Sequence, residues 1–187
     1  MREEPLESFW AQLSDDPAAT TRVWLIVPPD EVKLKASEVQ AAFRDLDWIA
    51  PLPEHFLHGS VWVGATAELD ADSASRAWAD VAPFLIAYRR ANCFHDAAIV
   101  EAHTSGVPAL VERACRHADL SLLLPHLSIG YTRRSEAADP LRTALRPFRE
   151  VDLGTGIVDE VLLCDVPVAK STFLRPWRLV GSVSLDG

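Results

Sequence analysis

Apolar positions in the first part of the chain alternate between strand-like runs and helical spacing. TRVWLIVPP, residues 21–29, is a short apolar run closed by prolines and predicts a β-strand. Five apolar residues then recur at intervals of three and four, as on one face of an amphipathic helix: Val32, Ala36, Val39, Phe43 and Leu46. Asp30 stands where the N-cap of this helix is expected. HGSVWVGA, residues 58–65, predicts a second strand, and a second helix is predicted over residues 74–81, ending near Pro83.

The same order of elements returns in the second part of the chain. FHDAAIVEA, residues 94–102, predicts a strand, and Pro108 stands where the next helix begins. LSLLLPHLSIGY, residues 120–131, predicts another strand. Asp139 and Pro140 are typical of the N-cap and the first residue of a last helix. Two β-rich runs follow, GIVDEVLLCDVPV and WRLVGSVSL.

Two copies of strand, helix, strand, helix, followed by two strands, predict an α+β fold built as a divergent internal repeat. We place the first repeat at about residues 21–90 and the second, with the closing strands, at 91–187. No linker rich in Gly, Ser or Pro divides them, and 187 residues with 49% hydrophobic content suffice for one core. We therefore expect a single domain of two lobes.

The charge balance limits the classes of partner. The formal net charge is −9, from 27 acidic and 18 basic residues. Proteins that coat long nucleic acids neutralise phosphates with Lys and Arg, so this balance argues against such a role. A small anionic substrate in a locally basic pocket remains compatible with it. No apolar segment is long enough to cross a bilayer, and the charged start MREEPLESFW has no signal-peptide core behind it.

The cysteines indicate the redox environment. Three of them, Cys93, Cys115 and Cys164, are widely spaced and form no CxxC pair. We therefore expect free thiols in a reducing compartment, neither a disulfide framework nor a structural zinc site, and a cytoplasmic location.

One short pattern occurs at the same place in both repeats. His58-Gly59-Ser60 and His126-Leu127-Ser128 are each a His-x-Ser in the third element of a repeat. Side chains two apart in a strand point to the same face, so each copy presents an imidazole and a hydroxyl together. A single His-x-Ser arises easily by chance, as His103-Thr104-Ser105 shows in a segment with loop composition. Two of them in matching positions favour a functional interpretation over a structural one.

At these residues the chain resembles a known family. LPEHFLHGSVWVG and LLPHLSIGYT are similar to the paired His-x-Ser/Thr-x signatures of the two-histidine (2H) phosphoesterase superfamily, with its 2′-5′ RNA ligase and cyclic phosphodiesterase branch. The resemblance covers nearly the whole chain. It implies a pseudo-twofold, bilobal α+β fold with two antiparallel sheets flanked by helices and a central cleft. It further implies that His58 and His126 are catalytic and that Ser60 and Ser128 bind the phosphate. Gly59 departs from the family, which has a bulkier apolar residue there.

The implied chemistry suits imidazole. Cleavage of a 2′,3′-cyclic phosphate or a 2′-5′ phosphodiester needs one group to remove a proton and another to deliver one, and imidazole titrates near neutral pH. No metal or other cofactor is then required. The expected substrate is a small nucleotide or a short RNA end. A 2′-5′ ligase activity and a non-catalytic nucleotide-binding module remain as alternatives. The assignment of acid and base, and the oligomeric state, stay open.

Other residues give weaker signals. Strict alternation places Trp62 on the face of His58 and Ser60, where it can stack on a base or support the sheet. The same alternation places Tyr131 on the opposite face from His126, which favours a core or rim position over substrate contact. Trp177, with its flanking arginines, fits a surface strand edge better than the rim of the site. The remaining histidines have no partners at metal-ligand spacing: His55, His95 and His117.

Overall fold

Two antiparallel sheets form the framework of the protein, for which a computed structural model describes residues 6–62, 69–114 and 124–186. Sheet A has the strand order β3 (Gly59–Trp62), β1 (Thr20–Ile26), β8 (Glu160–Pro167), β9 (Arg178–Ser184). Sheet B has the order β2 (Ile49–Pro51), β6 (His126–Thr132), β5 (Ala97–His103), β4 (Phe84–Cys93), β7 (Asp152–Val158). The predicted α+β class with two antiparallel sheets is confirmed.

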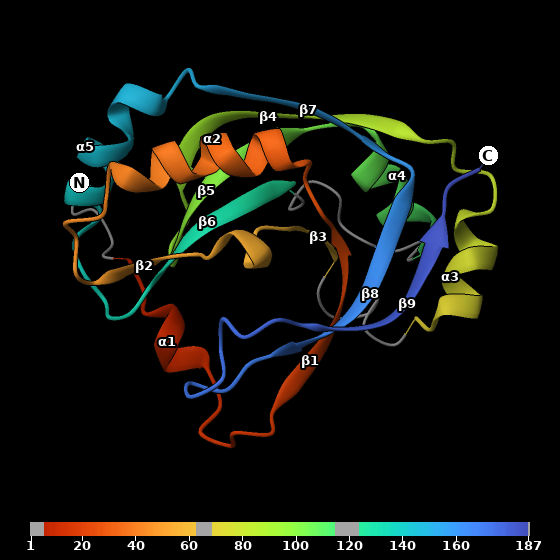
Figure 1. Ribbon diagram of the computed structural model, residues 1–187, viewed down its shortest axis with the longest axis horizontal. Coiled ribbons are helices and arrows are strands. Elements are labelled where there is room, and N and C mark those ends of the chain that lie inside the picture. Colours follow the sequence, from red (N-terminus) through yellow and green to blue (C-terminus); the bar gives the residue numbers. More distant parts are fainter. Residues whose placement is uncertain (1–5, 63–68, 115–123, 187) are drawn as a thin grey trace.

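Helices pack on both sheets, and two of them each pack beside the sheet to which their preceding strand does not belong (Figure 1). The helical segments are α1 (Phe9–Gln12), α2 (Asp30–Ala41), η1 (Glu54–Phe56), α3 (Ala71–Trp78), α4 (Gly106–Ala114), α5 (Ala138–Leu145) and η4 (Arg146–Phe148). Helix α2 follows a strand of sheet A but packs on β6 and β7 of sheet B. Helix α4 follows a strand of sheet B but packs on β3 and on α3, beside sheet A. Each sheet is therefore covered in part by a helix from the other half of the chain.

The predicted order strand, helix, strand, helix is present twice, as β1–α2–β3–α3 and β5–α4–β6–α5. The two predicted N-caps are wrong by one or two positions. Pro29 is the N-cap of α2, and Ala137 is that of α5, neither with a side-chain cap bond. Asp30 and Asp139 instead lie in the first turn of their helices, where a carboxylate is favoured by the helix dipole.

Three features of the strand pattern differ from the prediction. The short β2 and the long β4 were not predicted, and β4 contains the charged pair Arg89-Arg90. The run GIVDEVLLCDVPV is divided at Asp159 between β7 of sheet B and β8 of sheet A. The expected boundary near residue 90 lies inside β4, and the two-repeat division stays a prediction.

Most of the buried apolar residues in the described part of the chain form one cluster that both sheets share. Trp24 of β1 and Trp78 of α3 are its largest fully buried members, and their rings meet edge to face at 4.9 Å between centroids. The two indole nitrogens donate to backbone carbonyls, of Leu69 and Leu110 respectively, so that neither polar group is left unsatisfied. Among the described residues, no helix combines the length and the apolarity that a membrane-spanning helix requires.

Candidate active site

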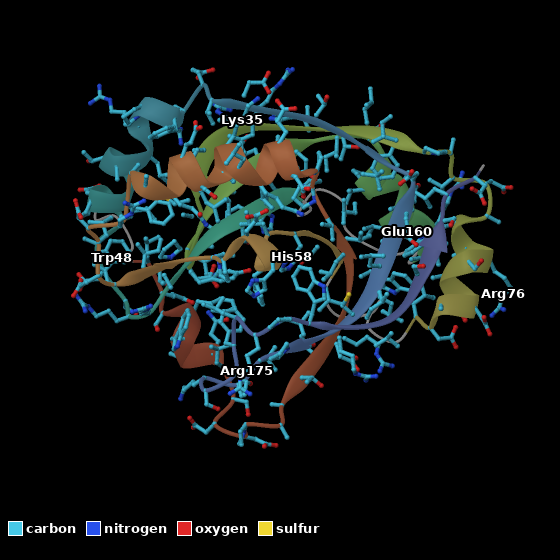
Figure 2. The ribbon with its side chains drawn as sticks, in the orientation of Figure 1. Lys35, Trp48, His58, Arg76, Glu160 and Arg175 are labelled. Carbon is cyan, nitrogen blue, oxygen red and sulfur yellow. The ribbon has the colours of Figure 1, made fainter. Side chains whose placement is uncertain are left out.

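The two His-x-Ser motifs meet where sheets A and B approach each other. Gly59 is buried, and a Cβ at this position would lie 3.4 Å from the carbonyl oxygen of His126. A Cβ there would already be in van der Waals contact with that backbone, so the absence of a side chain between His58 and Ser60 allows β3 and β6 to come close. Figure 2 shows His58 near the middle of the molecule, whereas Lys35 and Arg76 lie at its periphery.

The two imidazoles are held in the same way. Nδ1 of His58 lies 2.6 Å from the carbonyl oxygen of Phe56, and Nδ1 of His126 lies 2.8 Å from that of Leu124. In both cases the acceptor is the residue two positions earlier. A carbonyl oxygen only accepts, so Nδ1 of each ring must carry the hydrogen. Each neutral ring is therefore fixed as the tautomer whose Nε2 has a free lone pair.

Burial disfavours the positively charged form of both histidines. It lowers the pKa of His58 to about 4, and the nearby His126 adds to this effect. Burial also lowers the pKa of His126, although the hydrogen bond to Leu124 and the carboxylate of Asp96 oppose that shift. Without substrate, His58 is neutral at physiological pH. Among the described residues, a carboxylate favours the protonated form of His126 but none does so for His58, so the pair is electrostatically asymmetric.

An aromatic ring packs against each histidine. The ring of Trp177 meets that of His58 at 90° with 5.1 Å between centroids. The ring of Phe94 meets that of His126 at 75° and 4.7 Å. These edge-to-face contacts restrict rotation of the imidazoles about χ2. The preference for Trp177 as a surface strand residue is therefore wrong, because it is half-buried and contacts His58.

The two hydroxyls of the motifs differ in exposure. Ser60 is half-buried, whereas Ser128 is only 5% exposed. The side chain of Ser128 lies close enough to the phenol of Tyr131 to lower the pKa of that phenol. Burial has the larger effect and raises the pKa of Tyr131, so that this phenol stays protonated.

A β-bulge explains why Tyr131 reaches Ser128. In the pairing of β6 with β5, Ser128 faces Ile99 and Gly130 faces Ala98, which leaves Ile129 as an extra residue. An extra residue inverts the alternation that follows it. The expectation that Tyr131 lies on the opposite face from His126 is therefore wrong, and its role in substrate contact stays a prediction.

A bulge occurs at the matching place in β3. There Ser60 pairs with Leu25 and Trp62 pairs with Trp24, which leaves Val61 as the extra residue. Strict alternation, on which the expectation for Trp62 rested, does not hold at this point. The side chain of Trp62 lies outside the described part of the structure. Val61 and Ile129 are both fully buried, so each bulge residue anchors its motif strand in the core.

Two aromatic residues that the sequence did not single out lie near the site. Phe9 of α1 stacks on Tyr131 with 3.9 Å between ring centroids. Phe173, from the loop between β8 and β9, contacts Phe9, Tyr131 and Phe56. No local motif marks either residue, because each reaches the site from a segment remote in sequence.

The remaining histidines do not join the pair. His55 is exposed, with its Nε2 3.0 Å from the carbonyl oxygen of Leu174. His95 is exposed and lies 3.6 Å from the carboxylate of Asp96. His117 falls outside the described residues, as does Cys115, while Cys93 and Cys164 are free thiols. Among the described residues, no group of three or more His, Cys, Asp or Glu is arranged to hold a metal ion.

Comparison with known structures identifies the fold. TT0787 of Thermus thermophilus matches with a TM-score of 0.61 and 17% identity, over 90% of this chain and 99% of that chain. E. coli LigT in its apo form matches with a TM-score of 0.59 and 16% identity, over 99% of this chain and 100% of that chain. This protein has the fold of LigT.

The LigT-like fold is the one that the resemblance to the 2H superfamily implied. ATU0111 from Agrobacterium tumefaciens str. C58, described as a conserved protein of unknown function, also has it, with a TM-score of 0.57 and 11% identity, over 99% of this chain and 95% of that chain. No protein-family model matches the chain. No curated protein matches it either. At these identities the likeness concerns the fold alone.

Proposed function

We propose that this protein is a 2H phosphoesterase that hydrolyses a 2′,3′-cyclic phosphate or a 2′-5′ phosphodiester, in a nucleotide or at a short RNA end, without a metal ion. One observation carries the proposal: two imidazoles, one just before β3 and one at the start of β6, have the same kind of Nδ1 anchor, which leaves two Nε2 atoms for proton transfer. Acid–base catalysis needs such a pair, with one member neutral and one protonated.

The electrostatic asymmetry supports an assignment of roles. His58, with a pKa lowered to about 4, is the neutral ring suited to remove a proton from the attacking water. His126, close to Asp96, is the ring suited to be protonated and to deliver a proton to the leaving oxygen. An anionic phosphate between the rings favours their protonated forms, and so brings His126 towards the charge state that this role requires.

The serines supply hydrogen bonds to the phosphate. Ser128 lies on the same face of β6 as His126, and Ser60 follows His58 by two positions, as the second residue of β3. Their hydroxyls would donate to the non-bridging oxygens, where negative charge accumulates in the transition state. The phenol of Tyr131 lies beside Ser128 and adds a second hydroxyl to this part of the site.

Known structures favour a nucleotide as substrate. LigT has been crystallised with 3′-AMP, with ATP and with NADP+. The aromatic groups around the site, Phe9, Tyr131 and Trp177, offer flat surfaces of the kind on which bases stack. Free Cys93 and Cys164 suit a cytoplasmic location, which is part of the proposal.

Two alternatives share the same site. A 2′-5′ RNA ligase would use the same histidines in the reverse direction, since each proton transfer is reversible. A non-catalytic module would bind the nucleotide and leave it intact. Product analysis after incubation with 2′,3′-cyclic nucleotides and with 2′-5′-linked dinucleotides distinguishes hydrolysis, ligation and simple binding.

The test replaces each histidine by alanine. His58→Ala or His126→Ala is expected to lower the turnover of a 2′,3′-cyclic nucleotide by roughly 10²–10⁴, because either change removes one of two proton-transfer groups. His58→Asn keeps a donor for the Phe56 carbonyl and is expected to lose as much activity as His58→Ala. Near wild-type activity in a purified, folded His126→Ala protein would exclude the two-histidine mechanism.

His55→Ala is the matched control. His55 lies three residues before His58 in the same segment, but it is exposed and bonded only to the Leu174 carbonyl among the described residues. Its replacement is expected to leave turnover within about twofold of wild type, because a surface substitution removes little stability and no proton-transfer group.

A further inference from the structure

A small cavity lined by arginines lies apart from the histidines. It has a volume of about 260 Å³ at the junction of α5, η4 and the end of β4. Its lining residues are Asn92, Arg142, Arg146 and Arg149. All three charged groups are therefore positive, in a chain whose formal net charge is −9. Guanidinium groups around one hollow match the geometry of phosphate oxygens.

Two of these arginines keep their charge uncompensated. Arg142 lies 3.9 Å from the carboxylate of Asp139. In contrast, no carboxylate from the described segments pairs with Arg146 or Arg149. Nη1 of Arg149 donates instead to the side-chain oxygen of Asn92 at 2.7 Å, a neutral partner that fixes its position. An incoming anion would therefore meet positive charge already oriented towards the cavity.

The strand register connects this cavity with the histidine site. Ser128 on β6 faces Ile99 on β5, and Ile99 faces Asn92 on β4. Paired residues share a face of the sheet, so Asn92 and Ser128 lie on the same face, two strands apart. At about 4.7–4.9 Å between neighbouring strands, their backbones are about 10 Å apart.

A hydrogen bond connects Asn92, at the end of this row of paired residues, with the residue that faces His126. The amide of Asn92 donates to Glu101 at 2.9 Å, and Glu101 faces His126 across the β5–β6 ladder. Arg90 lies 3.9 Å from Glu101 and opposes its negative charge. Asn92 thus belongs both to the wall of the arginine cavity and to the face of sheet B that carries His126 and Ser128.

We propose that the arginine cavity is a second phosphate subsite, which binds the neighbouring phosphate of the substrate whose reacting phosphate lies between His58 and His126. The inference rests on the proposed function. It specifies the substrate class as an oligonucleotide of at least two phosphates, because each of the two subsites takes one phosphate. A cyclic mononucleotide would occupy only the histidine site.

The test compares two substrates that differ in the second phosphate. One is 2′,3′-cyclic AMP, and the other is the dinucleotide ApA with a 2′,3′-cyclic phosphate at its end. Arg146→Gln is expected to raise KM for the dinucleotide about tenfold, the loss typical of one charge-assisted contact, with kcat unchanged. For cyclic AMP, KM is expected to stay within about twofold of wild type, since that substrate has no second phosphate. In addition, the salt dependence of dinucleotide binding should decrease by about 0.7 in logarithmic slope.

Arg76→Gln is the matched control. Arg76 is an exposed arginine of α3, at the opposite end of the molecule from α5 (Figures 1 and 2). The same change in net charge at Arg76 should leave KM for both substrates as in wild type. Equal effects of Arg146→Gln on the two substrates, or no effect on either, would overturn the subsite.

A binding measurement separates this inference from the proposed function. Fluorescein-labelled pApA is titrated with wild type, Arg146→Gln and Arg76→Gln. About tenfold weaker binding by Arg146→Gln alone would support the subsite even if no substrate were turned over, in which case only the catalytic proposal fails. Equal binding by all three proteins would refute the subsite irrespective of catalysis.

Discussion

Buried His58 should make the folding stability depend on pH in a specific window. Its pKa is lowered to about 4 in the folded protein, against 6.5 for a free imidazole. The unfolded chain therefore binds more protons at His58 than the folded one, and the difference is largest between about pH 4 and pH 6.5. Stability rises with pH wherever the unfolded state holds more protons, so this contribution is lost as the pH falls from about 6.5 towards 4.

The two pKa values set the size of the effect. Relative to about pH 7.5, protonation of the unfolded chain at His58 should lower the free energy of unfolding by about 2 kcal/mol at pH 5 and about 3 kcal/mol at pH 4. His126 acts in the same direction, since its pKa is also lowered by burial. Comparison with a variant that lacks only the His58 titration isolates the contribution of His58.

His58→Asn is the suitable variant. Its side-chain amide can donate to the Phe56 carbonyl as Nδ1 does, but it does not titrate. Urea unfolding of both proteins between about pH 4 and pH 7.5 gives the difference in the free energy of unfolding. That difference should change by about 3 kcal/mol across the range, with wild type losing more stability on acidification. Parallel pH profiles, or an NMR titration of His58 with a pKa near the free-imidazole value of about 6.5, would refute the reasoning.

Two further predictions concern metal independence and the N-terminal segment. Incubation with EDTA should leave the rate of cyclic phosphate hydrolysis unchanged, whereas a loss that zinc or manganese restores would indicate a metallohydrolase. Thr132→Val should lower the free energy of unfolding by about 1–3 kcal/mol, since the hydroxyl of buried Thr132 accepts from the amide of Phe9 and contacts the carbonyls of Glu7 and Asp96. An unchanged denaturation midpoint would show that these contacts contribute nothing net.

Much of the architecture follows from local patterns in the sequence. Spacing of three and four over residues 32–43 predicted α2, and the apolar run at residues 21–29 predicted β1. The His-x-Ser pair stood out because it recurs at the same place in two similar series of elements. Periodicity and recurrence need no knowledge of distant contacts, and for that reason they were visible before the structure.

The rest depends on pairings that no local pattern records. The bulge at Ile129 moves Tyr131 to the face of Ser128, yet nothing in the sequence distinguishes Ile129 from a regular strand residue. Strand β4 escaped prediction because Arg89-Arg90 breaks its alternation. In the structure Arg90 is itself an extra residue there, with a left-handed φ of 71°. Phe9 and Phe173 reach the site only through tertiary contacts.

Sheet A joins strands from the two ends of the described chain, and this has a consequence for folding during synthesis. All strands of sheet B lie between residues 49 and 158, so that sheet can form once this stretch has left the ribosome. Strand β1, by contrast, must wait for its neighbour β8, and sheet A is complete only when β9 has emerged as far as Ser184. Pairing across such a sequence separation is slow, because loop closure costs entropy before any contact forms. The nascent chain should therefore hold β1 and β3, with the first histidine motif, in an incomplete sheet for longest, and chaperone binding is expected to concentrate there.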